Sequence, residues 1–147
     1  MTRSQKGTSV ISSILVSEKN PEEMRRSLVI SAFCSLFCLV FYLIYNIFSH
    51  GVHSPFMTFL FAWPLVLCVL PYALFVLVPG LPGPSLLSSL VWNTGTAAVT
   101  ISSLLRGVFD IAGNSSFYQV IMMAAGFILL ICGLILYIKG IMLLKKS

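Results

Sequence analysis

Residues 85–110 read SLLSSLVWNTGTAAVTISSLLRGVFD, and the predicted fold depends on this stretch. As a helix it is long enough to cross a bilayer, yet it is the most polar of the four apolar segments of the chain. Its polar and small residues recur at alternating spacings of four and three, which aligns them on one helix face. This polar stripe consists of Ser89, Asn93, Thr96, Thr100 and Ser103, and it ends at Arg106 and Gly107. Because an unpaired polar group in hydrocarbon is costly, we expect the stripe to face protein or water.

The composition of the whole chain agrees with a membrane location. Of 147 residues, 58% are hydrophobic and 9% are charged, and the mean hydropathy is +0.99. A soluble domain carries roughly 25% charged residues. The sequence therefore predicts an all-α fold, a polytopic membrane protein built as a four-transmembrane-helix bundle with short loops.

Turn residues and charged flanks divide the chain into a cytoplasmic leader, a transmembrane domain and a tail. The leader is 1–26, the domain is 27–144 and the tail is 145–147. The predicted spans are 27–48, 56–78, 85–109 and 117–138, with the last helix able to continue to residue 144. The segment Asn20-Pro21-Glu22-Glu23 predicts the start of the first helix, because it has a capping residue, a proline in the first turn and two acids at the positive end of the helix dipole.

The second predicted span contains two prolines, Pro64 and Pro71, seven residues apart. Each proline removes a backbone donor and clashes with the carbonyl four residues earlier. We therefore expect a bent helix in which the carbonyls of Leu60 and Leu67 take partners from neighbouring helices or water.

The fourth predicted span carries glycines at seven-residue intervals, which predict a helix-packing seam. Small residues at such spacing let membrane helices approach closely. The seam is Gly126, Gly133 and Gly140. We expect it to pack against the polar stripe of the third span, its hairpin neighbour.

The net charge of +5 comes from the two flanks of the apolar region. Five of the nine Lys and Arg precede the first span, three follow the fourth, and the loop 49–55 has none. Positive charge favours the cytoplasmic side, so both termini are predicted to be cytoplasmic in a multi-pass protein whose first partner is the lipid bilayer. This clustering at membrane edges argues against a nucleic-acid partner.

Arg106 and Asp110 are one turn apart near the outer end of the third span, where two interpretations are open. They can form a local ion pair, or Arg106 can extend to the headgroups. Alternatively, Arg106 lies at the mouth of a cavity lined by Ser103, Thr100 and Asn93 and binds an anion. Asn93 is similarly either a helix–helix hydrogen bond or a substrate contact, and the first is the commoner role for such a residue.

Metal and cofactor chemistry has little support in the sequence. His50 and His53 are spaced as a metal pair, and Asp110 could reach them from the other outer loop, but zinc takes three or four such ligands in tetrahedral geometry. The four cysteines all lie in apolar segments and are expected to pack as small hydrophobes, although Cys34 and Cys38 are one turn apart. We predict no cofactor, no metal site and no catalytic residue.

Two stretches carry a resemblance to a known family: residues 48–57, FSHGVHSPFM, and residues 92–111, from WNTGTA to RGVFDI. They resemble a family of small four-helix membrane proteins of Gram-positive bacteria to which no function is assigned. Asn93, Gly95 and Asp110 fit the pattern of that family, whereas His53 stands where the family has an aromatic residue. The resemblance implies a bacterial inner membrane and supplies no activity.

The sequence therefore leaves more than one function open. The first hypothesis is a non-enzymatic accessory or oligomeric membrane subunit, partnered by another membrane protein or by copies of itself. The alternative is a small transporter or channel that uses the polar face of the third span and the bent second span. A membrane enzyme has the least support, because the sequence shows no cluster of acid, base and nucleophile.

Overall fold

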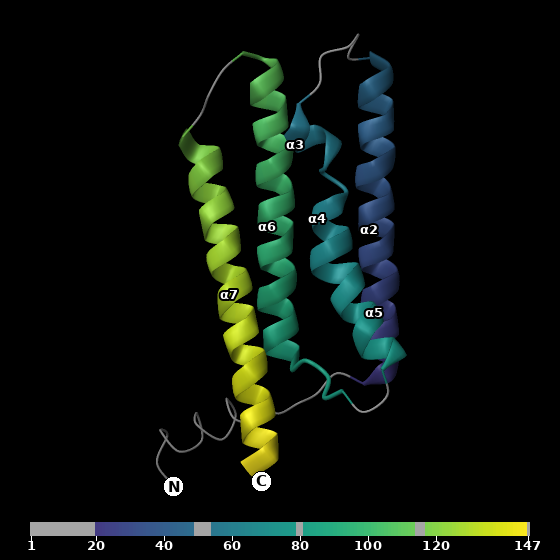
Figure 1. Cartoon of the computed structure of the whole chain (residues 1–147), viewed down its shortest axis with the longest axis vertical. Helices are drawn as coiled ribbons and strands as arrows, with labels where there is room; N and C mark the ends of the chain where they lie inside the picture. The colour runs from purple at the N-terminus through teal and green to yellow at the C-terminus, as the bar shows by residue number, and fades with distance from the viewer. Residues whose placement is uncertain (1–19, 49–53, 79–80, 114–116, 147) are drawn as a thin grey trace, which may run out of the picture.

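The computed structural model describes residues 20–48, 54–78, 81–113 and 117–146, and within them the fold is all-α. Three long helices, α2, α6 and α7, stand side by side with a shorter broken segment, and the start of α2 lies at the same end of the bundle as the end of α7 (Figure 1). Their bounds are Pro21–Phe48, Leu86–Ile111 and Phe117–Lys146. The leader residues 1–19 lie outside the described part of the chain.

The predicted start of the first helix is confirmed. Helix α2 begins at Pro21, with Glu22 and Glu23 in its first turn, and the backbone N–H of Met24 donates to the carbonyl of Asn20 at 3.0 Å. This arrangement places acids where the helix dipole is positive.

The second span was predicted as one bent helix, and this prediction is wrong. The chain forms α3 (Pro55–Thr58), a turn, and then one helical stretch built from α4 (Ala62–Pro64), a π-helical turn (Leu65–Val69) and α5 (Leu70–Leu77). The break precedes Pro64, whose ring would clash with the carbonyl of Leu60 in a continuous helix. After the break Pro64 lies in a first turn, where a backbone N–H has no partner within the helix in any case.

Helices α6 and α7 form the closest pair, as the glycine seam predicts, but through a different face of α6. A Cβ added to Gly126 would lie 3.0 Å from the backbone nitrogen of Val99, and one added to Gly133 would lie 3.1 Å from that of Trp92. Gly95 is equally close, at 2.9 Å from the nitrogen of Leu130. The row that faces α7 is Ser88, Trp92, Gly95, Val99 and Ser102.

This contact row is displaced by one residue, or about 100° around the helix, from the polar stripe. The stripe faces the broken segment, to which Asn93 and Ser103 form hydrogen bonds. It also faces the gap toward α2, where Asn93, Thr96 and Thr100 line a cavity. The predicted pairing of the two helices is therefore confirmed, while the predicted pairing of the glycines with the stripe is wrong. Gly140, the last glycine of the seam, is buried.

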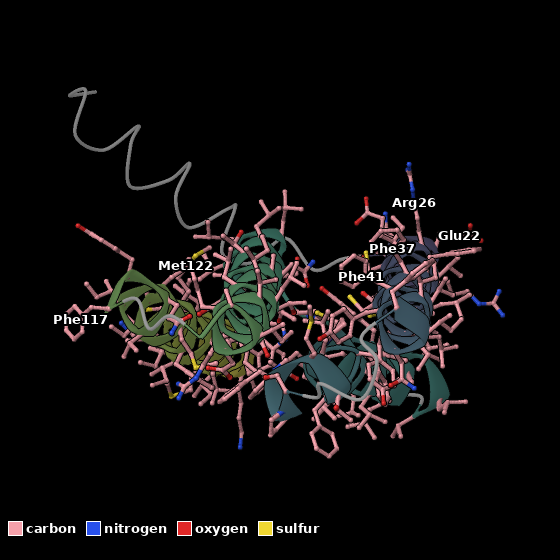
Figure 2. All side chains as sticks on the ribbon, turned by 90° about the horizontal axis from the view of Figure 1, so that it is seen from above. Glu22, Arg26, Phe37, Phe41, Phe117 and Met122 are labelled. Carbon is pink, nitrogen blue, oxygen red and sulfur yellow. The ribbon has the colours of Figure 1, made fainter. Side chains whose placement is uncertain are left out.

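Two described helices are long and apolar enough to cross a membrane, by length and composition alone. They are Pro21–Phe48, which is α2, and the Phe117–Leu143 part of α7. Only 6% of the most apolar window of α2 is buried, and its exposed residues include Phe33, Phe37 and Ile47. Figure 2 looks along the bundle and shows Phe37 on α2 and Phe117 on α7 at the periphery.

Candidate functional site

The predicted polar residue Asn93 is the centre of a small hydrogen-bonded group. Its side-chain oxygen Oδ1 accepts from the Tyr72 hydroxyl at 3.0 Å and from the Cys68 thiol at 3.5 Å. Cys68 lies in the π-helical turn and Tyr72 lies on α5, so Asn93 joins α6 to both. This geometry matches the interpretation of Asn93 as a helix–helix hydrogen bond.

Several backbone carbonyls of the broken segment accept hydrogen bonds from side chains on the neighbouring helices α6 and α2. Trp92 Nε1 on α6 donates to the carbonyl of Leu67 at 2.5 Å, and this is the carbonyl that Pro71 leaves without its usual donor. The partner predicted for Leu67 is therefore found.

Two further hydroxyls hold the same broken segment from opposite sides. Ser103 Oγ on α6 donates to the carbonyl of Phe56 at 3.2 Å, and Ser35 Oγ on α2 donates to the carbonyl of Phe61 at 3.1 Å. Ser103 is fully buried and Ser35 nearly so. These two bonds hold the segment between α2 and α6 through its backbone.

The remaining hydroxyls of the polar stripe are satisfied within α6 itself. Ser89 donates to the carbonyl of Leu86, Thr96 to that of Trp92, and Thr100 to that of Thr96, at 2.8–3.1 Å. Such bonds to the preceding turn let a hydroxyl lie in an apolar environment at little cost. Within α6, these side chains need no water.

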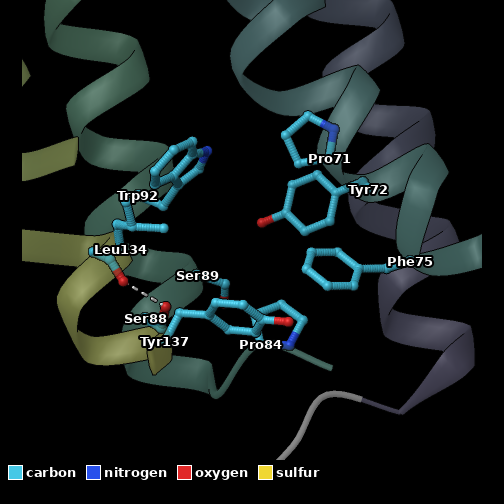
Figure 3. Close-up of a pocket in the computed structure, with 10 residues that line it drawn as sticks. Pro71, Tyr72, Phe75, Pro84, Ser88, Ser89, Trp92, Leu134 and Tyr137 are labelled. Carbon is cyan, nitrogen blue, oxygen red and sulfur yellow. Dashed lines mark hydrogen bonds between the residues drawn. The ribbon is translucent and has the colours of Figure 1, made fainter. Parts of the chain in front are cut away.

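A first cavity, of about 250 Å³, lies at the start of α6 between α5 and α7. Figure 3 shows Tyr72, Phe75, Trp92 and Tyr137 around it, with Ser89 at its side. The rings of Phe75 and Tyr137 meet edge to face with centroids 5.7 Å apart, and the Tyr137 hydroxyl donates to the carbonyl of Pro82 at 3.1 Å. Four of the ten lining residues are therefore aromatic, and one of them is held by a hydrogen bond to the backbone.

A second and larger cavity, of about 600 Å³, is a groove between α2 and α6. Three residues of the predicted stripe, Asn93, Thr96 and Thr100, line it, whereas Ser103 and Arg106 do not. Pro64 and Cys68 of the broken segment also line it. Both cavities fall within the size range of small-molecule sites, or just below it.

Arg106 and Asp110 do not form the predicted ion pair; each has another partner among the described residues. The guanidinium carbon of Arg106 lies 4.1 Å from the centroid of the Phe56 ring, and Asp110 Oδ2 accepts from Ser54 Oγ at 3.0 Å. Arg106 Nε is buried without a hydrogen-bond partner. The physical reason is the close approach of α3, where a Cβ on Gly107 would lie 3.2 Å from the backbone nitrogen of Met57. A cation over an aromatic face is stabilised electrostatically.

The metal candidates His50 and His53 lie outside the described residues, so their relation to Asp110 stays a prediction. Within the described part of the chain, no group of three His, Cys, Asp or Glu side chains is placed to hold a metal ion. Cys34, Cys38, Cys68 and Cys132 are free thiols. The first three of these line the groove.

Sequence reasoning missed Tyr72 and Gln119 as polar partners. The backbone carbonyl of Gln119 on α7 accepts from Ser102 Oγ at 2.6 Å, and its side-chain Oε1 is buried without a partner. Ser88 Oγ similarly donates to the carbonyl of Gly133 at 2.9 Å. Ser88 and Ser102 each lie one position before a stripe residue, in a row with the same alternating spacing. This second row was the sequence signal that could have predicted the contact with α7.

A comparison of the chain with protein families, curated proteins and solved structures finds no match.

Proposed function

We propose that this chain is an integral membrane protein with four membrane-crossing segments, 27–48, 56–78, 85–109 and 117–138, acting as a non-enzymatic accessory or oligomeric subunit. The exposed apolar surface of α2 supports the membrane placement. A soluble protein would bury a 28-residue apolar helix in its core, whereas 6% of the most apolar window of α2 is buried. The family resemblance supports a bacterial inner membrane.

The charge distribution supports cytoplasmic termini. Arg25 and Arg26 lie at the start of α2, and Lys139 and Lys145 lie toward the end of α7, at the same end of the bundle. Basic residues beside membrane spans are enriched on the cytoplasmic side.

One observation carries the subunit role: the polar groups of α6 are used to hold helices together. Asn93 bonds to Tyr72 and Cys68, and Ser103 bonds to the backbone of α3. A transport path would need these groups to face water or substrate. The test is purification in mild detergent with native mass determination, and we expect a stoichiometric complex with a partner or with further copies of the chain. A monomer that co-purifies with nothing would overturn the proposal.

A small transporter or channel is the second candidate, and the groove is the observation that favours it. Asn93, Thr96 and Thr100 line a space of about 600 Å³ beside the π-helical turn, and such turns are frequent at functional sites. Substitution of Asn93 and Arg106 separates the two candidates. Loss of flux in proteoliposomes with intact assembly favours transport, whereas loss of assembly favours the structural role.

A further inference from the structure

The groove between α2 and α6 has the dimensions of a site for a hydrocarbon chain. Its α6 wall runs from Asn93 to Ile101, nine residues that span about 12 Å of helix. Its α2 wall runs from Ile30 to Cys38, the same length. The lining residues that the structure describes carry no charge.

One hydrogen-bond donor in the groove is unused. Asn93 Oδ1 accepts from Tyr72 and Cys68, and no described residue accepts from its amide nitrogen Nδ2. Asn93 is half-buried, and an amide donor that faces hydrocarbon instead of water is costly without an acceptor. The groove therefore suits a chain that brings a carbonyl oxygen to Asn93.

A cation lies beyond one end of the groove, on the same face of α2. Arg26, Ile30, Phe33 and Phe37 follow each other at spacings of four, three and four, which aligns them on one side of the helix. The last three line the groove, and Arg26 is exposed at the end of the bundle where α2 begins. Figure 2 shows Arg26 and Phe37 on the same side of α2.

The positions of these groups along the bundle follow the order of groups in a phospholipid. Asn93 lies seven residues into α6, about 10 Å from its start, and the polar interface of a bilayer is about 5–7 Å deep on each side. Arg26 is thus at headgroup level, Asn93 lies just below the level of the ester carbonyls, and the rest of the groove lies in the hydrocarbon.

We infer that the groove binds one anionic phospholipid, with an acyl chain between α2 and α6, an ester carbonyl on Asn93 Nδ2 and the phosphate group on Arg26. The inference rests on the proposed membrane placement and is independent of whether the chain is a subunit or a transporter. Charge complementarity at Arg26 selects an anionic headgroup over a zwitterionic one.

The test is native mass spectrometry of the full chain, purified in a neutral detergent, stripped of lipid and titrated with phosphatidylglycerol or with phosphatidylcholine of identical acyl chains. We expect one phosphatidylglycerol per chain, held about fivefold more tightly than phosphatidylcholine, as one basic residue at a membrane surface gives. The variant R26A should lose this preference. Arg25 lies about 100° around the helix from Arg26, so R25A is the matched control and should retain it.

A second pair of variants tests the hydrocarbon part of the site. Ala97→Trp fills the groove and should abolish retention of both lipids, whereas Ile128→Trp, on the exposed outer side of α7, should leave it unchanged. Circular dichroism and size-exclusion profiles establish that each variant is folded. Equal losses in R25A and R26A, or unchanged retention in Ala97→Trp, would overturn the inference.

The membrane placement and the subunit role are tested by measurements separate from lipid binding. Carbonate extraction of membranes reports whether the chain is integral, and the mass of the purified assembly reports whether it has partners. Lipid retention at this groove depends on neither the partner nor the oligomeric state, so the three results can be read independently.

Discussion

The Tyr72 hydroxyl donates to Asn93 Oδ1 across 3.0 Å, and the two residues line different cavities. Tyr72 lines the smaller, aromatic cavity, whereas Asn93 lines the groove between α2 and α6. The bond therefore joins a residue of one cavity wall to a residue of the other. It also ties α5 to α6 through a single side-chain contact.

Removal of this bond should destabilise the bundle by a modest amount. Tyr72→Phe deletes the hydroxyl, and we expect a loss of about 0.6 kcal/mol, the mean for such bonds between membrane helices. Asn93→Leu should cost more, about 1–3 kcal/mol, because it removes the oxygen that accepts from both Tyr72 and Cys68. Unfolding by SDS in mixed micelles measures both. Thr94→Val is the control, since Thr94 is exposed and bonds only to its own helix at Leu90; an equal loss there would contradict the assignment.

Gly126 and Gly133 of α7 should tolerate no larger side chain. Gly126→Leu would place its Cβ 2.7 Å from Val99 Cγ2 and 3.0 Å from the Val99 nitrogen, so α6 and α7 must separate. We expect a loss of about 1–3 kcal/mol, as for overpacked cores. Ala124→Leu, on the exposed side of the same helix, should be close to neutral in the same unfolding measurement. Tolerance of leucine at Gly126 would mean that the two helices do not pack through this seam.

The orientation of the chain can be read by labelling single cysteines in intact cells. We expect Ala112→Cys, at the end of α6, to react with a membrane-impermeant maleimide, and Lys145→Cys, at the end of α7, to react only after the membrane is opened. The parent chain, whose free thiols lie in apolar helices, gives the background. The reverse labelling pattern would place both termini outside.

The helical class, the start of α2 and the close pairing of α6 with α7 followed from local sequence rules. Caps, prolines and glycine spacing act within one or two turns, so a sequence pattern is enough to predict them. The face of α6 that meets α7 was predicted one residue away from its true position. Both rows, the one through Asn93 and the one through Trp92, have the same alternating spacing, and only the packed neighbours distinguish them.

The same local rules could not predict that the second span breaks, or which residues bond to Asn93. Pro64 is equally compatible with a kink and with a break, and the outcome depends on whether neighbouring hydroxyls can take the carbonyls that a break exposes. Ser103 does so at Phe56 from 47 residues away in sequence. Ser35, 26 residues away, adds a second donor to the Phe61 carbonyl, which also accepts from the Leu65 backbone. Such distant pairings are a property of the assembled bundle.

The bond from Trp92 Nε1 to the Leu67 carbonyl replaces a backbone donor that Pro71 lacks, and its contribution to stability can be tested by mutation. Trp92→Phe leaves that carbonyl without its partner and should cost about 1–3 kcal/mol. In a Pro71→Ala background, residue 71 regains an N–H that can donate to Leu67 within its own helix. The same Trp92→Phe change should then cost less.

A double-mutant cycle measured by SDS unfolding reports this coupling directly, and we expect an interaction energy of about 1 kcal/mol. Pro64→Ala is the matched control. Pro64 lies in the first turn of its helix, where a missing N–H leaves no carbonyl unpaired, so its cycle with Trp92→Phe should be additive. Additive costs for Pro71 as well would show that the tryptophan contributes through its ring packing, and the indole would then not substitute for the backbone donor.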